Sequence, residues 1–219
     1  MTFDVSFALE ILPALLSALR VTVAATVAGS LLALVLGLVL AIVRRSPLVW
    51  LARAGSLIVE AVRSTPLLIQ IYFLYYALPG LGLRLSPLAT GVIALGLHYS
   101  SYAAEVYRAG IEAVPRGQWE AARALGFSTP ATWRRVVLPQ AIPPIVPALG
   151  NYGVAMFKDT PLLAAITVLE LLQTAKIIGA ERFRYLEPLT LVGLLFLALS
   201  LLASAGVRRL ERRLVVRHA

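Results

Sequence analysis

Polar side chains within long apolar stretches are the residues of this 219-residue chain whose type and position could do chemistry. His98 lies in a stretch that begins near Pro87, and Asn151 lies in one that begins near Gln140. At about 1.5 Å per residue, each side chain would be about 16 Å along its helix, near a bilayer midplane. Polar groups are costly at that depth and tend to face a cavity, so both are candidates for contact with a polar solute. The alternative is that each one hydrogen-bonds to a neighbouring helix.

Ser101 and Glu60 complete this set of candidates. Ser101 is one of several hydroxyl residues in the same stretch as the histidine, and Glu60 lies in another apolar stretch, where it could meet an ammonium group. Arg63 follows Glu60 by three positions, so the alternative is an ion pair on one helix face. Glu105 and Arg108 have the same spacing and are expected to form a structural pair.

A catalytic site within the membrane would need a nucleophile and a base within hydrogen-bond reach. His98 and Ser100 are two positions apart, so on a helix they point in different directions. The chain has no cysteine, and its other histidine is His218 near the C-terminus. These observations argue against an intramembrane enzyme.

The composition is that of a membrane protein. Hydrophobic residues make up 59% and charged residues 14%, whereas soluble proteins average about 45–50% and about 25%. The mean hydropathy of +0.84 agrees. The net charge of +9 would suggest nucleic acid in a soluble chain. Here the basic residues cluster in loops expected to face the cytoplasm, so no nucleic-acid partner is predicted.

Hydropathy divides the chain into five predicted spans within a single transmembrane domain, 1–219. The first span, 21–43, follows an apolar segment at 7–20 that we interpret as an interfacial lead-in helix, because Glu10 and Pro13 interrupt it. An extracytoplasmic N-terminus would leave fourteen of the twenty Lys and Arg on the inner side, which the positive-inside rule favours. The predicted orientation is N-out and C-in. The other spans are 57–78, 87–107, 139–157 and 188–207, with a cytoplasmic loop at 109–139 and a basic cytoplasmic tail at 208–219.

Small residues on the first span indicate a close helix contact. Gly29, Ala33 and Gly37 lie four apart and therefore share one helix face. Small residues at that spacing let two backbones approach each other in a membrane.

The cytoplasmic loop contains a segment, Gln118–Gly126, that predicts a helix of about two turns. Ala, Glu, Leu and Arg favour helix, and Gly126 is placed to end it. A helix this short is not stable alone in water and needs a surface to pack on. Trp119, Ala122, Leu125 and Phe127 offer apolar contact. The surface is either a partner protein or the chain's own bundle.

This segment resembles the Glu-Ala-Ala signature of the permease subunits of bacterial binding-protein-dependent ABC importers. Glu120, Ala121, Ala122 and Gly126 match it, and after nine intervening residues Val136 stands where isoleucine is usual. Leu138 and Pro139 complete the pattern. Three further segments, 63–70, 102–111 and 158–163, are similar to polar amino-acid permeases, although serine is commoner where Pro161 stands.

The resemblance implies a type I ABC importer permease fold with five spans in the bacterial inner membrane. In that family the short helix docks on a cytoplasmic ATPase, so Glu120, Ala121, Ala122, Leu125, Gly126, Leu138 and Pro139 are expected to couple ATP hydrolysis to transport. The implied partners are two ATPase subunits carrying ATP and magnesium, an identical or homologous second permease subunit, an extracytoplasmic binding protein and an amino-acid-like solute. No cofactor is expected in this chain, which has no phosphate-binding Gly-x4-Gly-Lys loop.

Two other functions stay open at this point. The solute could be a compatible solute such as ectoine instead of an amino acid. A stand-alone secondary transporter or channel is the alternative from another class. Five spans without an inverted repeat argue against the transporter, and no filter-like motif supports the channel.

Overall fold

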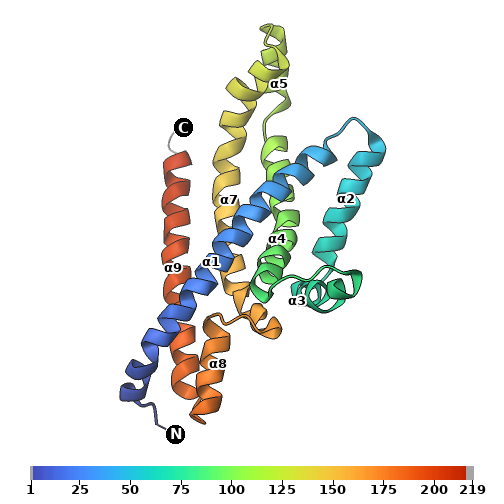
Figure 1. Ribbon diagram of the computed structural model, residues 1–219. Coiled ribbons are helices and arrows are strands. Elements are labelled where there is room, and N and C mark those ends of the chain that lie inside the picture. Colours follow the sequence, from blue (N-terminus) through green and yellow to red (C-terminus); the bar gives the residue numbers. More distant parts are fainter. Residues whose placement is uncertain (1, 216–219) are drawn as a thin grey trace.

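The computed structural model describes residues 2–215, and every element within that range is a helix or a helical turn. The helices form one elongated bundle, with the N-terminus and α8 at one end and α5 at the other (Figure 1). The expected all-α fold class is confirmed. The longer helices are α1 (Val5–Arg44), α2 (Val49–Ser64), α4 (Pro87–Glu112), α7 (Leu138–Asp159), α8 (Leu171–Glu181) and α9 (Leu186–Val215); the short ones are α3 (Leu67–Tyr72), α5 (Arg116–Ala124) and α6 (Thr129–Thr132).

Helix α1 runs unbroken for 40 residues, so the prediction of a separate lead-in helix at 7–20 was wrong. Asp4 caps its start by accepting two backbone N–H groups. Pro13 lies inside the helix without ending it. Tertiary packing outweighs the local cost of the proline, because this part of α1 buries a face against α8 and α9. The buried residues of that face are Phe7, Ile11 and Leu15.

The small-residue face of α1 crosses α4 at close range, as the spacing predicted. Gly29, Ala33 and Gly37 are all buried. A Cβ atom built on Gly37 would lie 2.6 Å from the Cβ of Ala103 and 2.9 Å from the backbone oxygen of Ser100. Such distances leave no room for any side chain, so glycine sets how closely the two helices meet.

The predicted second span, 57–78, is not one helix. The chain bends by 103° between α2 and the helical segment that follows it. Thr65 is extended and Pro66 caps the next helix, because the residue before a proline is driven out of the helical region. Helix α3 therefore lies across the end of α2 (Figure 1). The carbonyls freed at the break are used, since the Gln70 side-chain amide donates to Val62 O and Thr65 O at 2.8 and 2.9 Å.

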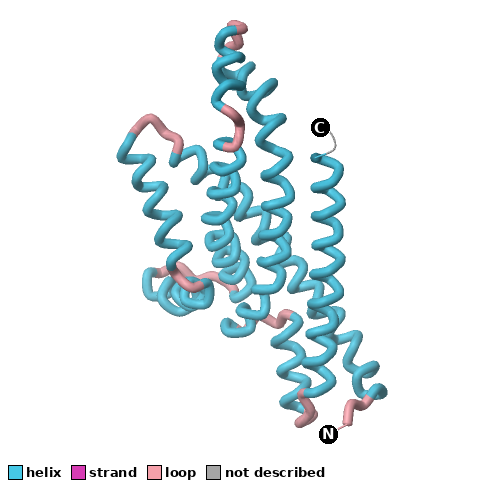
Figure 2. Tube along the Cα trace, turned by 180° about the vertical axis from the view of Figure 1, so that it is seen from behind, coloured by secondary structure: helices cyan, strands magenta, loops and turns pink. Residues whose placement is uncertain are grey.

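A cluster of ion pairs closes the end of the molecule that holds the N-terminus, and we call it the terminal clamp. Arg184, in the turn between α8 and α9, bonds to Asp4 at 3.2 Å and to Glu187. The backbone N–H of Asp4 donates to Glu187 at 3.0 Å, and Arg182 pairs with Glu10 at 2.8 Å. Figure 2 shows the N-terminus beside this turn. The clamp fastens the first helix to the last.

Two helices, α1 and α9, are each long and apolar enough to cross a membrane, and two bent pairs could bring the number to four. The pairs are the broken α2 segment and Thr129–Ile166 with Leu171–Glu181, which bends by 49°. Helix α4 is long enough but carries His98, Ser100 and Ser101. It is the central helix of the bundle, packed against α1, α2 and α7. Its polar residues therefore lie among protein atoms, which tolerate them better than lipid does.

Candidate functional site

The predicted cytoplasmic helix is present as α5, and local sequence explains both of its ends. Pro115 occupies the N-cap position. At the other end Gly126 has a φ of 74°, a left-handed conformation that glycine adopts without strain. The N–H of Gly126 donates to Arg123 O, and the N–H of Phe127 donates to Ala122 O, both at 3.0 Å. This pair of bonds is the Schellman arrangement, which satisfies the last carbonyls of the helix.

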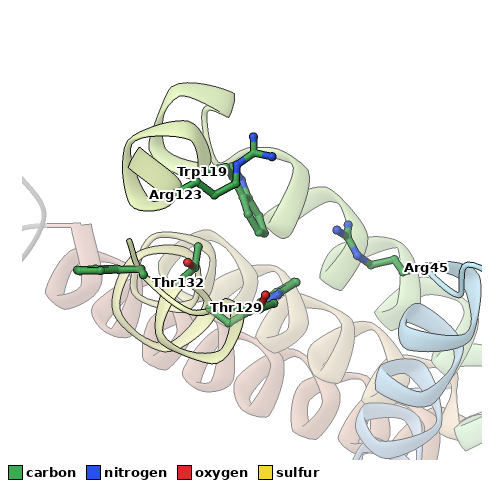
Figure 3. Close-up of a pocket in the computed structure, with 7 residues that line it drawn as sticks. Arg45, Trp119, Arg123, Thr129 and Thr132 are labelled. Carbon is green, nitrogen blue, oxygen red and sulfur yellow. The ribbon is translucent and has the colours of Figure 1, made fainter. Parts of the chain in front are cut away.

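The two faces of α5 have different surroundings. Trp119 meets Trp133 edge to face, with ring centroids 5.3 Å apart, and Ala122 is only 2% exposed. On the other side Glu120 and Ala121 are exposed, and Leu125 is 74% exposed. Figure 3 shows Trp119 directed from α5 toward the segment below it. Of the four residues predicted to offer apolar contact, Trp119 and Ala122 face the protein's own chain.

Leu138 and Pro139 lie away from the exposed face of α5, at the start of α7. A wide helical turn, Trp133–Val137, leads into them, and Val137 is fully buried. Leu138 is 40% exposed. The structure thus places these two residues where the segment that carries α5 is joined to a long helix.

His98 is half-buried within α4 and has partners on two sides. Its Nδ1 atom lies 3.1 Å from the Gln70 amide nitrogen at the break between α2 and α3. Its ring lies 5.4 Å from the ring of Tyr102, which in turn lies 5.3 Å from Tyr152 of α7. Tyr99 of the same cluster donates its hydroxyl to Asp159 at 2.6 Å. The structure therefore joins α3, α4 and α7 in one polar aromatic cluster around His98.

The other three candidates do not join this cluster directly. Ser101 is fully buried, and its hydroxyl donates to the backbone oxygen of His98 at 2.6 Å. Asn151 is exposed on α7. Glu60 is exposed on α2, where the Ser64 hydroxyl lies 3.4 Å away.

Two ion-pair predictions had different outcomes. The pair between Glu105 and Arg108 is present at 2.8 Å. Arg63 does not pair with Glu60 and instead lies 3.8 Å from Glu105, with its guanidinium over the Tyr102 ring. Glu105 also accepts a bond from Arg44 at 2.5 Å. A long-range partner has replaced the local one, because Glu105 can collect three guanidinium groups from α1, α2 and α4.

Four residues around this cluster were not among the predicted site residues: Gln70, Tyr99, Tyr152 and Asp159. Each becomes significant only through a contact with another helix. The tyrosines at 99 and 102 are three positions apart, which puts them on one helix face, and that spacing was the available signal.

The match to known proteins covers most of the chain. The family model for the binding-protein-dependent transport system inner membrane component matches residues 33–216. This chain belongs to that family. The importer-permease resemblance and the location in the bacterial inner membrane, as a multi-pass protein, are thereby confirmed.

Individual relatives of this permease subunit agree. A probable amino-acid ABC transporter permease protein, y4tG of Sinorhizobium fredii, is 46% identical over 205 residues, 94% of this chain and 89% of that protein. The glutamine transport system permease protein GlnP of Escherichia coli is 36% identical over 170 residues, 76% of this chain and 78% of GlnP.

Solved structures have the same fold as this permease subunit. A crystal structure of an amino acid ABC transporter with histidines superposes with a TM-score of 0.92 at 34% identity, over 97% of this chain and all of the other. A MetNI methionine ABC transporter in an inward-facing form gives a TM-score of 0.78 at 22% identity, over 94% of this chain and 98% of the other, and supports the fold alone. The predicted type I importer permease fold is confirmed.

Proposed function

We propose that this permease subunit takes up amino acids, and that α5 couples its movement to ATP hydrolysis on cytoplasmic partner subunits. One observation carries the proposal. Leu125 is 74% exposed at the end of a short helix whose opposite face is anchored to its own chain through Trp119 and Ala122. An anchored helix with an exposed apolar end is suited to transmit force from a docked partner.

The names of the relatives support amino acids as the solute. One solved relative is an amino acid ABC transporter whose crystal structure is with histidines, and GlnP is a permease protein of a glutamine transport system. The path would run beside the polar aromatic cluster around His98, with Glu60 and Asn151 exposed on neighbouring helices. Ser101 would act by holding α4 in shape, because its hydroxyl is already bonded within that helix.

The proposed assembly has two ATPase subunits that bind ATP and magnesium, a second permease subunit and an extracytoplasmic binding protein. The proposed topology has five spans with the N-terminus outside, α4 being the span whose polar residues the bundle encloses. The basic residues of α9 after residue 207 would then lie in the cytoplasm together with α5. Arg217 of the predicted tail lies outside the described residues.

A photo-crosslinking amino acid at position 125 tests the coupling role. In native membranes it is expected to capture an ATPase subunit. The same label at Phe183, which is 85% exposed at the other end of the molecule, is the matched control and should not. Crosslinks from position 125 only to lipid or to this chain itself would contradict the docking role.

Reconstitution with the cognate ATPase and binding protein tests the solute. Uptake of an amino acid that requires ATP is the expected result. Uptake of ectoine alone would reassign the solute class. Uptake by the purified chain without any ATPase would favour a stand-alone transporter.

A further inference from the structure

A cavity of about 410 Å³ lies beside the anchored face of α5. It is bounded by α5 on one side and by α6 with the turn that follows on the other, and Arg45 reaches it from the end of α1 (Figure 3). This volume is within the range of small-molecule sites. Its lining residues are Arg45, Trp119, Arg123, Phe127, Thr129, Thr132 and Trp133.

The walls of this cavity are largely fixed in place. Trp119 and Trp133 brace each other edge to face. The guanidinium carbon of Arg45 lies 5.7 Å from the centroid of the Trp133 ring, a cation–π distance. Thr132 is 6% exposed, and its hydroxyl donates to Ser128 O at 3.1 Å. The cavity is therefore a built feature of the segment that carries α5.

The charge of the cavity is unbalanced. Arg45 and Arg123 both line it, and no carboxylate does. Among the ion pairs within residues 2–215, none involves either of these two guanidinium groups. The cavity therefore carries two positive charges without a compensating carboxylate in its lining, which favours an anion over a cation or a neutral ligand.

The donor set fits a phosphate better than a carboxylate. Each guanidinium presents a planar fork of N–H donors that can bind two phosphate oxygens. Two forks from separate elements, in a cavity that Thr129 also lines, suit an anion with more than two acceptor oxygens. A carboxylate offers two oxygens and a phosphate ester offers more.

We propose that this cavity binds a phosphate group through Arg45 and Arg123, beside the edge-to-face pair formed by Trp119 and Trp133. The group is carried by an anionic phospholipid headgroup or is free in the cytoplasm. The position suits a headgroup, because Arg45 directly follows α1 and tryptophans are enriched where a membrane meets water. It also suits a free phosphate, because both arginines are exposed. Bound phosphate would tie the end of α1 to α5. That mechanical consequence rests on the proposed coupling role, whereas the binding itself does not.

Tryptophan fluorescence can report the binding. The chain has three tryptophans, so Trp50→Phe leaves the two in the cavity wall as the reporters. The full chain carrying Trp50→Phe is purified in detergent without partner subunits, so that no other tryptophan or phosphate-binding site contributes, and is titrated with inorganic phosphate, with dihexanoyl-phosphatidylglycerol and with dihexanoyl-phosphatidylcholine. A saturable change with inorganic phosphate identifies a free-phosphate site. A saturable change with phosphatidylglycerol, and a weaker one with phosphatidylcholine, identifies a lipid site.

Substitutions then locate the site. Arg45→Gln and Arg123→Gln are each expected to weaken binding about tenfold, the loss of one charge-assisted contact. Arg45→Lys should weaken it less, because the charge remains and only the fork is lost. Arg53→Gln, which removes an exposed arginine on α2 outside the cavity, is the matched control and should bind as before.

Three results would overturn the proposal: no saturable change with either phosphate probe, equal responses to the two lipids without a response to phosphate, or equal weakening by Arg53→Gln. A variant that misfolds is recognised by its elution in gel filtration, and Thr129→Val then provides a second, uncharged test with the same expected weakening. The fluorescence titration needs neither transport nor ATP. Phosphate binding can therefore be absent while position 125 crosslinks to an ATPase, and phosphate binding can be present while that crosslink is absent.

Discussion

At the scale of single residues, Gly126 determines where α5 ends. Its φ of 74° is a conformation in which a Cβ atom is strained, although no atom lies within 4 Å of where that Cβ would be. Gly126→Ala therefore tests backbone strain alone, with an expected cost of about 1–2 kcal/mol at this position. We expect reduced solute-stimulated ATP hydrolysis with normal membrane insertion, measured in proteoliposomes containing the whole transporter.

Gly117 supplies the matched control for that substitution. It lies in the same helix, also has no atom within 4 Å of a built Cβ, and does not have a left-handed φ. Gly117→Ala should leave coupling intact, because alanine favours helix more than glycine does. Equal loss of coupling in both variants would show that surface shape, and not the helix end, is what matters.

At the scale of elements, the crossing of α1 and α4 depends on the absence of a side chain at Gly37. Gly37→Ala should push the two helices apart and lower the free energy of unfolding by about 1–3 kcal/mol, because the added methyl group would overlap Ala103 and a backbone oxygen. Gly206→Ala in α9, where the built Cβ has open space, should not destabilise. Thermal unfolding in detergent measures both, and a similar loss in the two variants would contradict the role of close approach.

An element could be predicted from the sequence where the residues that define its ends lie within a few positions of it. It could not where the defining contacts lie far away along the chain. Helix α5 was predictable because its start and its end are set by residues within a few positions, Pro115 and Gly126. The unbroken α1 was not, because Pro13 is tolerated only through packing on α8 and α9, about 160 positions later. The break before Pro66 could be predicted, because proline drives the preceding residue out of the helical region. The bend of 103° at this break could not be predicted from the local sequence.

The candidate site shows the same division. The anchored face of α5 could not be separated from its exposed face in the sequence, since Trp119 and Leu125 are both apolar. Their different roles come from Trp133, which the following turn brings back against α5. Likewise the spacing of Arg63 and Glu60 favoured a pair between them, but the fold brings Arg63 to Glu105 instead.

At the scale of the whole molecule, the terminal clamp should make the attachment of α1 sensitive to acid. The pKa of the Asp4 carboxyl lies below its ordinary value, chiefly because the backbone N–H of Phe7 donates to it. Desolvation opposes this effect, whereas Arg184 and the N–H of Ser6 add to it. A lowered pKa in the folded state means that the contribution is present at neutral pH and is lost as the pH falls below about 4. The protection factors of the first-turn amides of α1, which compare each exchange rate with the intrinsic rate at the same pH, should therefore fall on acidification.

Asp4→Asn is the informative variant for the terminal clamp. Asparagine caps a helix about as well as aspartate, so the helix start is preserved while the charge is lost. The variant should exchange faster at neutral pH and respond less to acid than the original chain. Glu10→Gln removes the more exposed pair with Arg182 and should change exchange less. An unchanged acid response in Asp4→Asn would assign the titration to another group.

The orientation of the whole bundle can be read directly, because the chain contains no cysteine. Single cysteines at Phe183 and Leu125 replace exposed residues at opposite ends of the molecule. In intact cells a membrane-impermeant maleimide should label the first and label the second only after lysis. The reverse pattern would place α5 outside the cell and would exclude contact with a cytoplasmic ATPase.

The unbroken α1 makes the permease subunit a lever. Forty residues of helix form a rod about 60 Å long, twice the thickness of the hydrocarbon layer. The N-terminal end of this rod is held by ion pairs to the turn before α9. Its C-terminal end lies beside the proposed phosphate-binding cavity. A swing of about 5° around the middle of the rod displaces each tip by about 2.6 Å in opposite directions. Small rearrangements at the N-terminal end of α1 thus reach its other end undiminished, without any chain of intervening side chains to relay them.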